Sequence, residues 1–186
     1  KIETTMTDHL REEPIGSRIA FTGRLLTVRV DTVRLPDGRT ATRDVVVHPG
    51  AVAIVPLLDV KHVLLVRQWR NAAGHAMLEI PAGTLSPGED PAACATRELM
   101  EEVGYRPQRL TPLYTMLLAP GYSTEVITLF LAEELAPERL AHDVDENIEV
   151  VTLSWDQVDD LLLRGELGDA KTLAGLLLAK KLLDAR

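Results

Sequence analysis

The sequence predicts an α+β fold in which a small antiparallel β-unit precedes a larger domain of interspersed strands and helices. Short β-branched runs and capped helices follow one another, and the gaps between the runs are too varied for a regular βαβ series. The chain has 186 residues, of which 46% are hydrophobic, so it can bury a core of ordinary size. We divide it into an N-terminal unit over residues 1–47 and a main domain over residues 48–186.

The N-terminal unit has the pattern of a β-hairpin. We expect the polar residues 1–16 to be loosely ordered. Apolar and polar residues alternate over 26–31, as in a half-buried strand. The Pro-Asp-Gly sequence at 36–38 predicts a turn, and 39–47 returns as the partner strand. Because such a hairpin is marginal alone, we expect it to pack on the rest of the chain or on a second subunit.

The main domain follows a His-Pro-Gly break at 48–50. Its predicted strands are short β-branched runs at 51–56, 62–68, 113–118, 126–132 and 148–153. Capping residues predict three helices. They begin after Asp90, after Ser154 and after Asp169, and the first of them ends before Gly104.

Charge and composition exclude several classes of partner. The net charge of −8 argues against nucleic acid, because binders of that backbone need a basic face, but bound divalent cations could still admit a phosphate substrate. We expect no membrane partner, since the chain shows neither a signal peptide nor an apolar run of spanning length. The single cysteine, Cys94, fits a cytoplasmic setting, and we expect it to be buried and inert. The five histidines lack ligand spacing, which disfavours zinc.

The clearest chemical signal lies on the first predicted helix. Glu98, Glu101 and Glu102 stand at positions i, i+3 and i+4 and share one face of an α-helix. Like charges at this spacing destabilise a helix by roughly 0.2–0.5 kcal/mol per pair, so the cluster favours a bound cation such as Mg²⁺. Three glutamates alone could equally form a solvated face. The small apolar residues at 92–95 indicate a tightly packed helix instead, and Arg97 is placed to orient Glu101.

The segment 83–105 resembles the signature of the Nudix hydrolases, Gly-x5-Glu-x7-Arg-Glu-U-x-Glu-Glu-x-Gly-U, where U is a bulky aliphatic residue. The matching positions are Gly83, Glu89, Arg97, Glu98, Leu99, Glu101, Glu102 and Gly104. Only the aromatic Tyr105 departs from the pattern, and that position concerns packing. The resemblance implies an α/β/α sandwich with a mixed sheet, and hydrolysis of a diphosphate that depends on Mg²⁺, with Mn²⁺ as a substitute.

The resemblance also implies roles for individual residues. The metal ligands would be Glu98 and Glu102, with Glu101 sharing a second ion and the carbonyl of Ala82 as a further ligand. Arg97 would hold Glu101 and Glu89 in place. Gly83 and Gly104 would serve the backbone at the loop and at the end of the helix.

The flanking segments are similar to those of the ADP-ribose pyrophosphatase branch. The similar stretches are 66–70, 78–83, 119–125 and 165–172, and the likeness as a whole covers roughly 17–183. Pro120 stands where that branch has its diagnostic proline, although Ala119 replaces the preceding serine. The similarity implies hydrolysis of ADP-ribose, or of a related nucleoside diphosphate sugar, to AMP and ribose 5-phosphate.

Several residues outside the signature are candidates for substrate contacts. Arg70 can bind a phosphate with two hydrogen bonds, and Glu79, Pro120 and Gly121 are further candidates. We expect Trp69 to lie in the core.

An acidic loop is the candidate source of the group that holds or deprotonates water. Glu146 fits that role best by position, although it could, like Asp143 and Asp145, belong to an ordinary acidic surface loop.

Two alternatives stay open at the level of function. The chain could be a Nudix hydrolase of GDP-mannose, NADH, a damaged nucleotide or a dinucleoside polyphosphate, whose hydrolases also have a tyrosine near Tyr122. It could also be a non-catalytic Nudix-fold binding domain, although that usually goes with a broken signature. We expect a homodimer in which the N-terminal unit crosses to the partner, with Phe21 or Leu26 as candidate contacts of the adenine.

Overall fold

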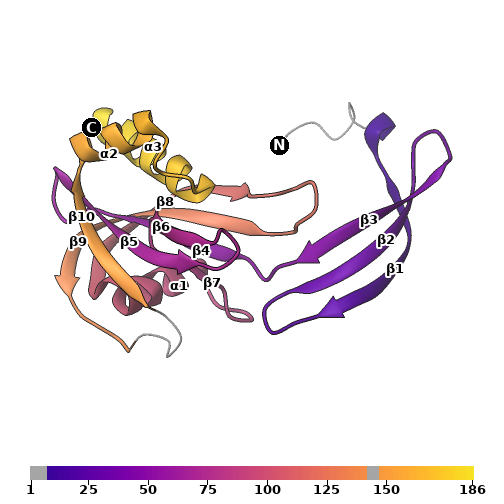
Figure 1. Cartoon of the computed structure of the whole chain (residues 1–186), viewed down its shortest axis with the longest axis horizontal. Coiled ribbons are helices and arrows are strands. Elements are labelled where there is room, and N and C mark those ends of the chain that lie inside the picture. Colours follow the sequence, from indigo (N-terminus) through magenta and orange to yellow (C-terminus); the bar gives the residue numbers. More distant parts are fainter. Residues whose placement is uncertain (1–7, 142–146) are drawn as a thin grey trace. The chain divides into compact units, whose positions relative to one another are not determined.

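The computed structural model of the chain describes residues 8–141 and 147–186, which form two compact units (Figure 1). The first unit comprises the described residues up to His48 together with Ala119–Glu125. The second comprises Pro49–Leu118 and the described part of Val126–Arg186. The segment Ala119–Glu125 is joined to the first unit by backbone hydrogen bonds, because Val46 donates to the Tyr122 carbonyl at 2.8 Å.

The first unit contains an antiparallel sheet in the strand order β1-β2-β3. After a short 3₁₀ turn, η1 (Asp8–Leu10), its strands are β1 (Glu13–Thr22), β2 (Thr27–Arg34) and β3 (Thr40–Val47). The predicted hairpin corresponds to β2 and β3. The prediction of loose order through residue 16 is wrong, because β1 begins at Glu13. Every residue of β1 is exposed, so this strand is not half-buried, which is the kind of strand that hydrophobic alternation identifies.

The second unit contains two sheets within its described residues. One has the order β7-β4-β9-β8 and is mixed, because β4 runs parallel to β9 while the other pairs are antiparallel. Its strands are β4 (Ala51–Pro56), β7 (Ala82–Thr84), β8 (Tyr105–Leu117) and β9 (Val126–Pro137). The other sheet is antiparallel with the order β10-β5-β6. Its strands are β5 (His62–Arg70), β6 (His75–Glu79) and β10 (Ile148–Ser154).

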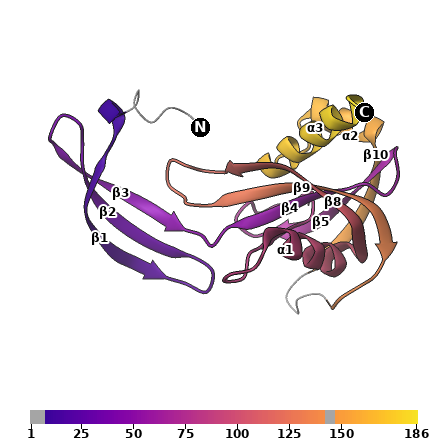
Figure 2. The ribbon, with the colours of Figure 1, turned by 180° about the vertical axis from the view of Figure 1, so that it is seen from behind.

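Helices cover both sides of these sheets, as Figures 1 and 2 show. One side has α1 (Pro91–Glu98), continued by η2 (Leu99–Val103), and the other has α2 (Trp155–Arg164) and α3 (Ala170–Asp184). All six residues of β4 are buried, and the first five alternate between two hydrophobic clusters. Val55 packs in the cluster of Leu176 on α3, and Ile54 in the cluster of Leu99. The predicted α/β/α sandwich is therefore confirmed.

The predicted helix starts are confirmed by the caps. Asp90 accepts hydrogen bonds from two backbone N–H groups, Ser154 forms a capping box with Gln157, and Asp169 accepts from the N–H of Thr172. Among the described residues, no helix has the length and apolar character that crossing a bilayer requires.

We expected the side chains of Cys94 and Trp69 to be buried, and the structure confirms this for Cys94 alone of the two. Cys94 is fully buried. Trp69 is 64% exposed, so the prediction that it lies in the core is wrong. The buried part of β5 covers 63–66, and Trp69 lies beyond it, on the part of the strand that the core leaves uncovered.

A close approach between α3 and β4 gives a test of the packing. A Cβ on Gly175 would lie 2.8 Å from Ile80 Cδ1 and 3.1 Å from Val55 Cγ2, and both of these side chains are fully buried. Alanine is better than glycine in a helix by about 1 kcal/mol. Overpacking a core costs about 1–3 kcal/mol, which the gain in helix propensity offsets in part, so we expect Gly175→Ala to lower the free energy of unfolding in urea by up to about 2 kcal/mol. The exposed Lys181→Ala should change it by less than about 0.5 kcal/mol. A more stable Gly175→Ala protein would contradict this packing.

Candidate active site

The acidic residues lie where the first helix changes its hydrogen-bonding pattern. α1 ends at Glu98, and η2 is a π-helical turn that closes when the Gly104 N–H donates to the Leu99 carbonyl at 3.0 Å. A π-turn closes i→i+5 hydrogen bonds, so the regular α-helical spacing ends at Glu98. Glu98 and Glu101 still converge, as the predicted shared face requires, because both carboxylates lie 2.8 Å from Arg97 Nη1. Glu98 and Glu102 are 8% and 2% exposed, whereas the side chain of Glu101 is 24% exposed.

Both buried carboxylates lie against strand β7. The Ala82 N–H donates to Glu102 Oε2 at 3.3 Å. A Cβ on Gly83 would lie 1.9 Å from the carboxylate carbon of Glu98, so only glycine leaves room for that carboxylate. The fold thus brings Ala82 and Gly83 of β7 together with Glu98 and Glu102, which the chain reaches only after the loop that leads into α1.

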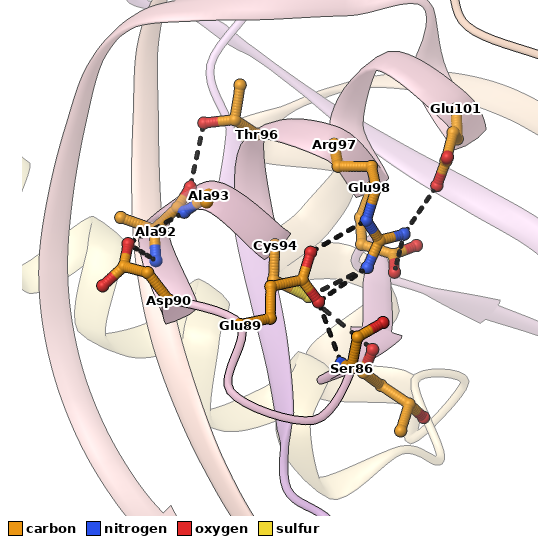
Figure 3. Close-up of polar contacts among 11 residues, drawn as sticks. Ser86, Glu89, Asp90, Ala92, Ala93, Cys94, Thr96, Arg97, Glu98 and Glu101 are labelled. Carbon is orange, nitrogen blue, oxygen red and sulfur yellow. Dashed lines mark hydrogen bonds and ion pairs between the residues drawn. The ribbon is translucent and has the colours of Figure 1, made fainter.

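Arg97 contacts the other carboxylates of the segment, as Figure 3 shows. Its Nε and Nη2 donate to Glu89 at 3.0 and 3.2 Å, and its Nη1 donates to Glu101 at 2.8 Å. The same Nη1 lies 2.8 Å from Glu98 Oε1. Arg97 therefore links the loop before α1 to Glu98 and Glu101.

This ion-pair cluster changes the acidity of its members. The hydrogen bonds from Arg97, supported by one from the backbone of Ser86, lower the pKa of Glu89 to about 2. The hydrogen bond to Glu89 and the charge of Glu98 raise the pKa of Arg97 above its usual value. Burial, together with the charge of Glu98, raises the pKa of the Cys94 thiol to about 12, which agrees with an inert cysteine.

The oxygen donors of this site fit a hard divalent cation. Within residues 8–141 and 147–186, no three His, Cys, Asp or Glu side chains form a group that would hold an ion by themselves. Mg²⁺, however, is usually held by one or two carboxylates together with waters and substrate phosphates. Glu98 and Glu102 supply two such carboxylates, and the absence of a side chain at Gly83 leaves the room that the first of them occupies.

Arg70 and Glu79 form a second charged cluster. Arg70 Nε and Nη2 donate to the two carboxylate oxygens of Glu79 at 2.7 and 2.8 Å. Glu79 is only 2% exposed, so it serves as a partner of Arg70 more readily than as a substrate contact. The hydrogen bond to Glu79 raises the pKa of Arg70, and the charges of Glu102 and Asp169 add to this effect. Arg70 therefore lies within the electrostatic reach of the buried glutamates.

Two residues of this second cluster, Lys171 and Asp169, have no counterpart among the sequence-based candidates. Lys171 donates to Glu79 and to Asp169 from the start of α3. Asp169 is recognisable in the sequence as a helix cap, but the buried position of the lysine two residues later is not.

The remaining candidates do not belong to the described part of the second unit. Pro120 and Gly121 belong to the first unit, in the segment that pairs with β3. Glu146 lies outside the described residues, as do Asp143 and Asp145.

Comparison with known proteins identifies the family. Residues 47–176 match the model of the NUDIX domain. The chain belongs to the Nudix family. Residues 12–46 match the nucleoside diphosphate sugar hydrolase N-terminal domain, so this Nudix hydrolase is of the class that acts on nucleoside diphosphate sugars. The Nudix family generally uses a divalent metal.

Its relatives include several hydrolases of adenosine diphosphate compounds. The Nudix chain is 38% identical to the ADP-ribose pyrophosphatase of Bacillus subtilis, over 88% of this chain and 89% of that protein. It is 37% identical to the ADP-ribose pyrophosphatase of Mycobacterium tuberculosis, over 89% and 81%. A solved structure of an ADP compounds hydrolase superposes with a TM-score of 0.86 at 28% identity, over 95% of this chain and 96% of that one.

The pKa of Glu89 gives a pH-dependent prediction. Because this pKa falls from 4.5 to about 2 on folding, the stabilisation from Glu89 is complete above about pH 5 and is lost as the pH falls towards 2. Glu89→Gln should therefore be less stable than the wild type at neutral pH, and the difference should shrink in acid. Urea unfolding of both proteins between pH 7 and pH 3 measures this, and a difference that stays constant with pH would contradict it.

Proposed function

We propose that this Nudix hydrolase cleaves the diphosphate of ADP-ribose to AMP and ribose 5-phosphate with Mg²⁺, for which Mn²⁺ can substitute. The observation that carries the chemistry is the pair of buried carboxylates, Glu98 and Glu102, packed against Ala82 and Gly83. The choice of ADP-ribose is supported by the two ADP-ribose pyrophosphatases among its relatives, which are matched over most of their length.

The carboxylates of Glu98 and Glu102 and the carbonyl of Ala82 would hold the metal, and Glu101 would contribute to a second ion. When bound, the metal supplies positive charge for the diphosphate and a water of lowered pKa. Without it, two buried negative charges would repel the substrate, so the binding of the two should be coupled. Arg97 has the role of keeping Glu98 and Glu101 in fixed orientations.

Arg70 would bind a phosphate oxygen of the substrate. Its hydrogen bonds to Glu79 use Nε–H and one N–H of Nη2, while a guanidinium has five N–H donors. The side chain is 39% exposed, so the donors that Glu79 does not use can reach a ligand. The bidentate contact with Glu79 orients the guanidinium before the substrate arrives.

Three further assignments rest on the sequence. We assign to Glu146 the role of holding or deprotonating the attacking water, and to Pro120 and Gly121 contacts with the substrate. These follow from their positions relative to the family signature.

We also propose that the protein is a homodimer through its N-terminal unit. β1 is at the edge of its sheet, and its exposed apolar side chains are Ile15, Ile19 and Phe21. Exposed apolar edge strands typically mark interfaces. Sedimentation equilibrium should give twice the chain mass for the wild type and a shift towards the monomer for Ile19→Lys. A wild-type monomer at micromolar concentration would contradict the proposal.

The activity is tested with ADP-ribose and Mg²⁺, with AMP as the product to be identified. Glu98→Gln and Glu102→Gln should each lower kcat by about a hundredfold or more, since losing even a supporting residue of a metal site costs about 10–100-fold. Glu138→Gln, which changes an exposed glutamate paired with Arg106, is the control and should keep the wild-type rate. Undiminished hydrolysis by Glu98→Gln would reject the catalytic assignment. A clear preference for GDP-mannose, NADH or a dinucleoside polyphosphate would reject ADP-ribose as the substrate.

A further inference from the structure

A buried lysine next to the site has no part in the mechanism above. Lys171 is 8% exposed and stands at the second position of α3. Its Nζ donates to Glu79 and, at 2.8 Å, to Asp169, which caps the same helix. Burying an ammonium group is costly unless it is paired and hydrogen-bonded, and here two carboxylates do both.

The same helix end is tied to the backbone that leads into the metal site. Thr172 is fully buried, and its hydroxyl donates to Asp169 at 2.5 Å and accepts from the Ile80 N–H at 3.0 Å. Ile80 follows Glu79 directly and precedes Ala82 by two residues. The start of α3 therefore contacts both a side chain and the backbone of this short segment.

Glu79 is the link between Lys171 and Arg70. One of its carboxylate oxygens accepts from Arg70 Nε, and the other accepts from both Arg70 Nη2 and Lys171 Nζ. Burial raises the pKa of Glu79, but the hydrogen bond from Arg70 and the charge of Lys171 together lower it below its usual value. The lysine thus fixes the plane of a carboxylate, and that carboxylate fixes the plane of a guanidinium.

We propose that Lys171 is a positioning residue that holds Arg70, through Glu79, in the orientation that binds a substrate phosphate. This inference rests on the role proposed for Arg70. The competing interpretation is that the cluster only fastens α3 to the end of β6, in which case Lys171 affects stability but not Arg70.

A double-mutant cycle distinguishes these interpretations. With ADP-ribose and Mg²⁺, Lys171→Met should lower kcat/KM about tenfold in the wild-type background, as losses of supporting residues do. In the Arg70→Ala background, Lys171→Met should lower kcat/KM less than about twofold, because the effect of Lys171 passes through Arg70. Lys180→Met, which removes an ion pair between the same helix and Asp159 of α2, should leave kcat/KM unchanged. Equal factors in the two backgrounds, or no loss in the first, would overturn the proposal.

A second readout needs neither metal nor substrate. The Nε–H of Arg70, which is bonded to Glu79, should give a slowly exchanging signal in ¹⁵N–¹H NMR spectra, assigned by its absence in Arg70→Ala. Lys171→Met should shift this signal and speed its exchange, whereas Lys180→Met should not. An unchanged signal in Lys171→Met would overturn the positioning role. If the signal changes but the wild type does not hydrolyse ADP-ribose, the positioning of Arg70 stands and the proposed substrate fails.

Loss of Lys171 could prevent folding, because it leaves Glu79 buried with a single cation. Asp169→Asn then replaces it, since asparagine caps helices about as well as aspartate but lacks the charge that holds Lys171. We expect about a threefold loss of kcat/KM from this change in the wild-type background and none in Arg70→Ala. Additive effects would again overturn the proposal.

Discussion

The site depends on the close approach of the Glu98 carboxylate to the backbone at Gly83. No side chain fits between them, and the neighbouring Ala82 N–H contacts Glu102 at the same place. Glu102 lies in the π-turn that follows Glu98, and Glu101 of the same turn pairs with Arg97 at 2.8 Å. One strand end and one irregular helix end therefore place the oxygen donors that a divalent cation needs.

Fixed cations on two sides keep these carboxylates ordered. Arg97 joins Glu98 and Glu101 to the loop ahead of α1, and Arg70 lies within electrostatic reach of Glu102 while Glu79 holds it. Groups that are oriented before the substrate binds cost no reorganisation during the reaction. This explains why so many charged side chains around the site form ion pairs with one another.

The sequence predicts the helix caps and shows the family signature, because these depend on local patterns, and the resemblance to the Nudix hydrolases implies the sandwich. Other features depend on tertiary structure, and these were predicted wrongly or not predicted at all. β1 is exposed throughout, and Trp69 lies on an uncovered strand end. The contact between Lys171 and Glu79 joins residues 92 positions apart, so no spacing in the sequence reports it.

Binding of Mn²⁺, followed by electron paramagnetic resonance in the absence of substrate, tests the central contact most directly. If the Glu98 carboxylate needs the space beside Gly83, Gly83→Ala should weaken Mn²⁺ binding by about tenfold or more. Gly16→Ala, whose added Cβ would lie 3.9 Å from its nearest neighbour, should bind like the wild type. Wild-type affinity in Gly83→Ala would contradict the account, because the two carboxylates would then not need this backbone to hold an ion.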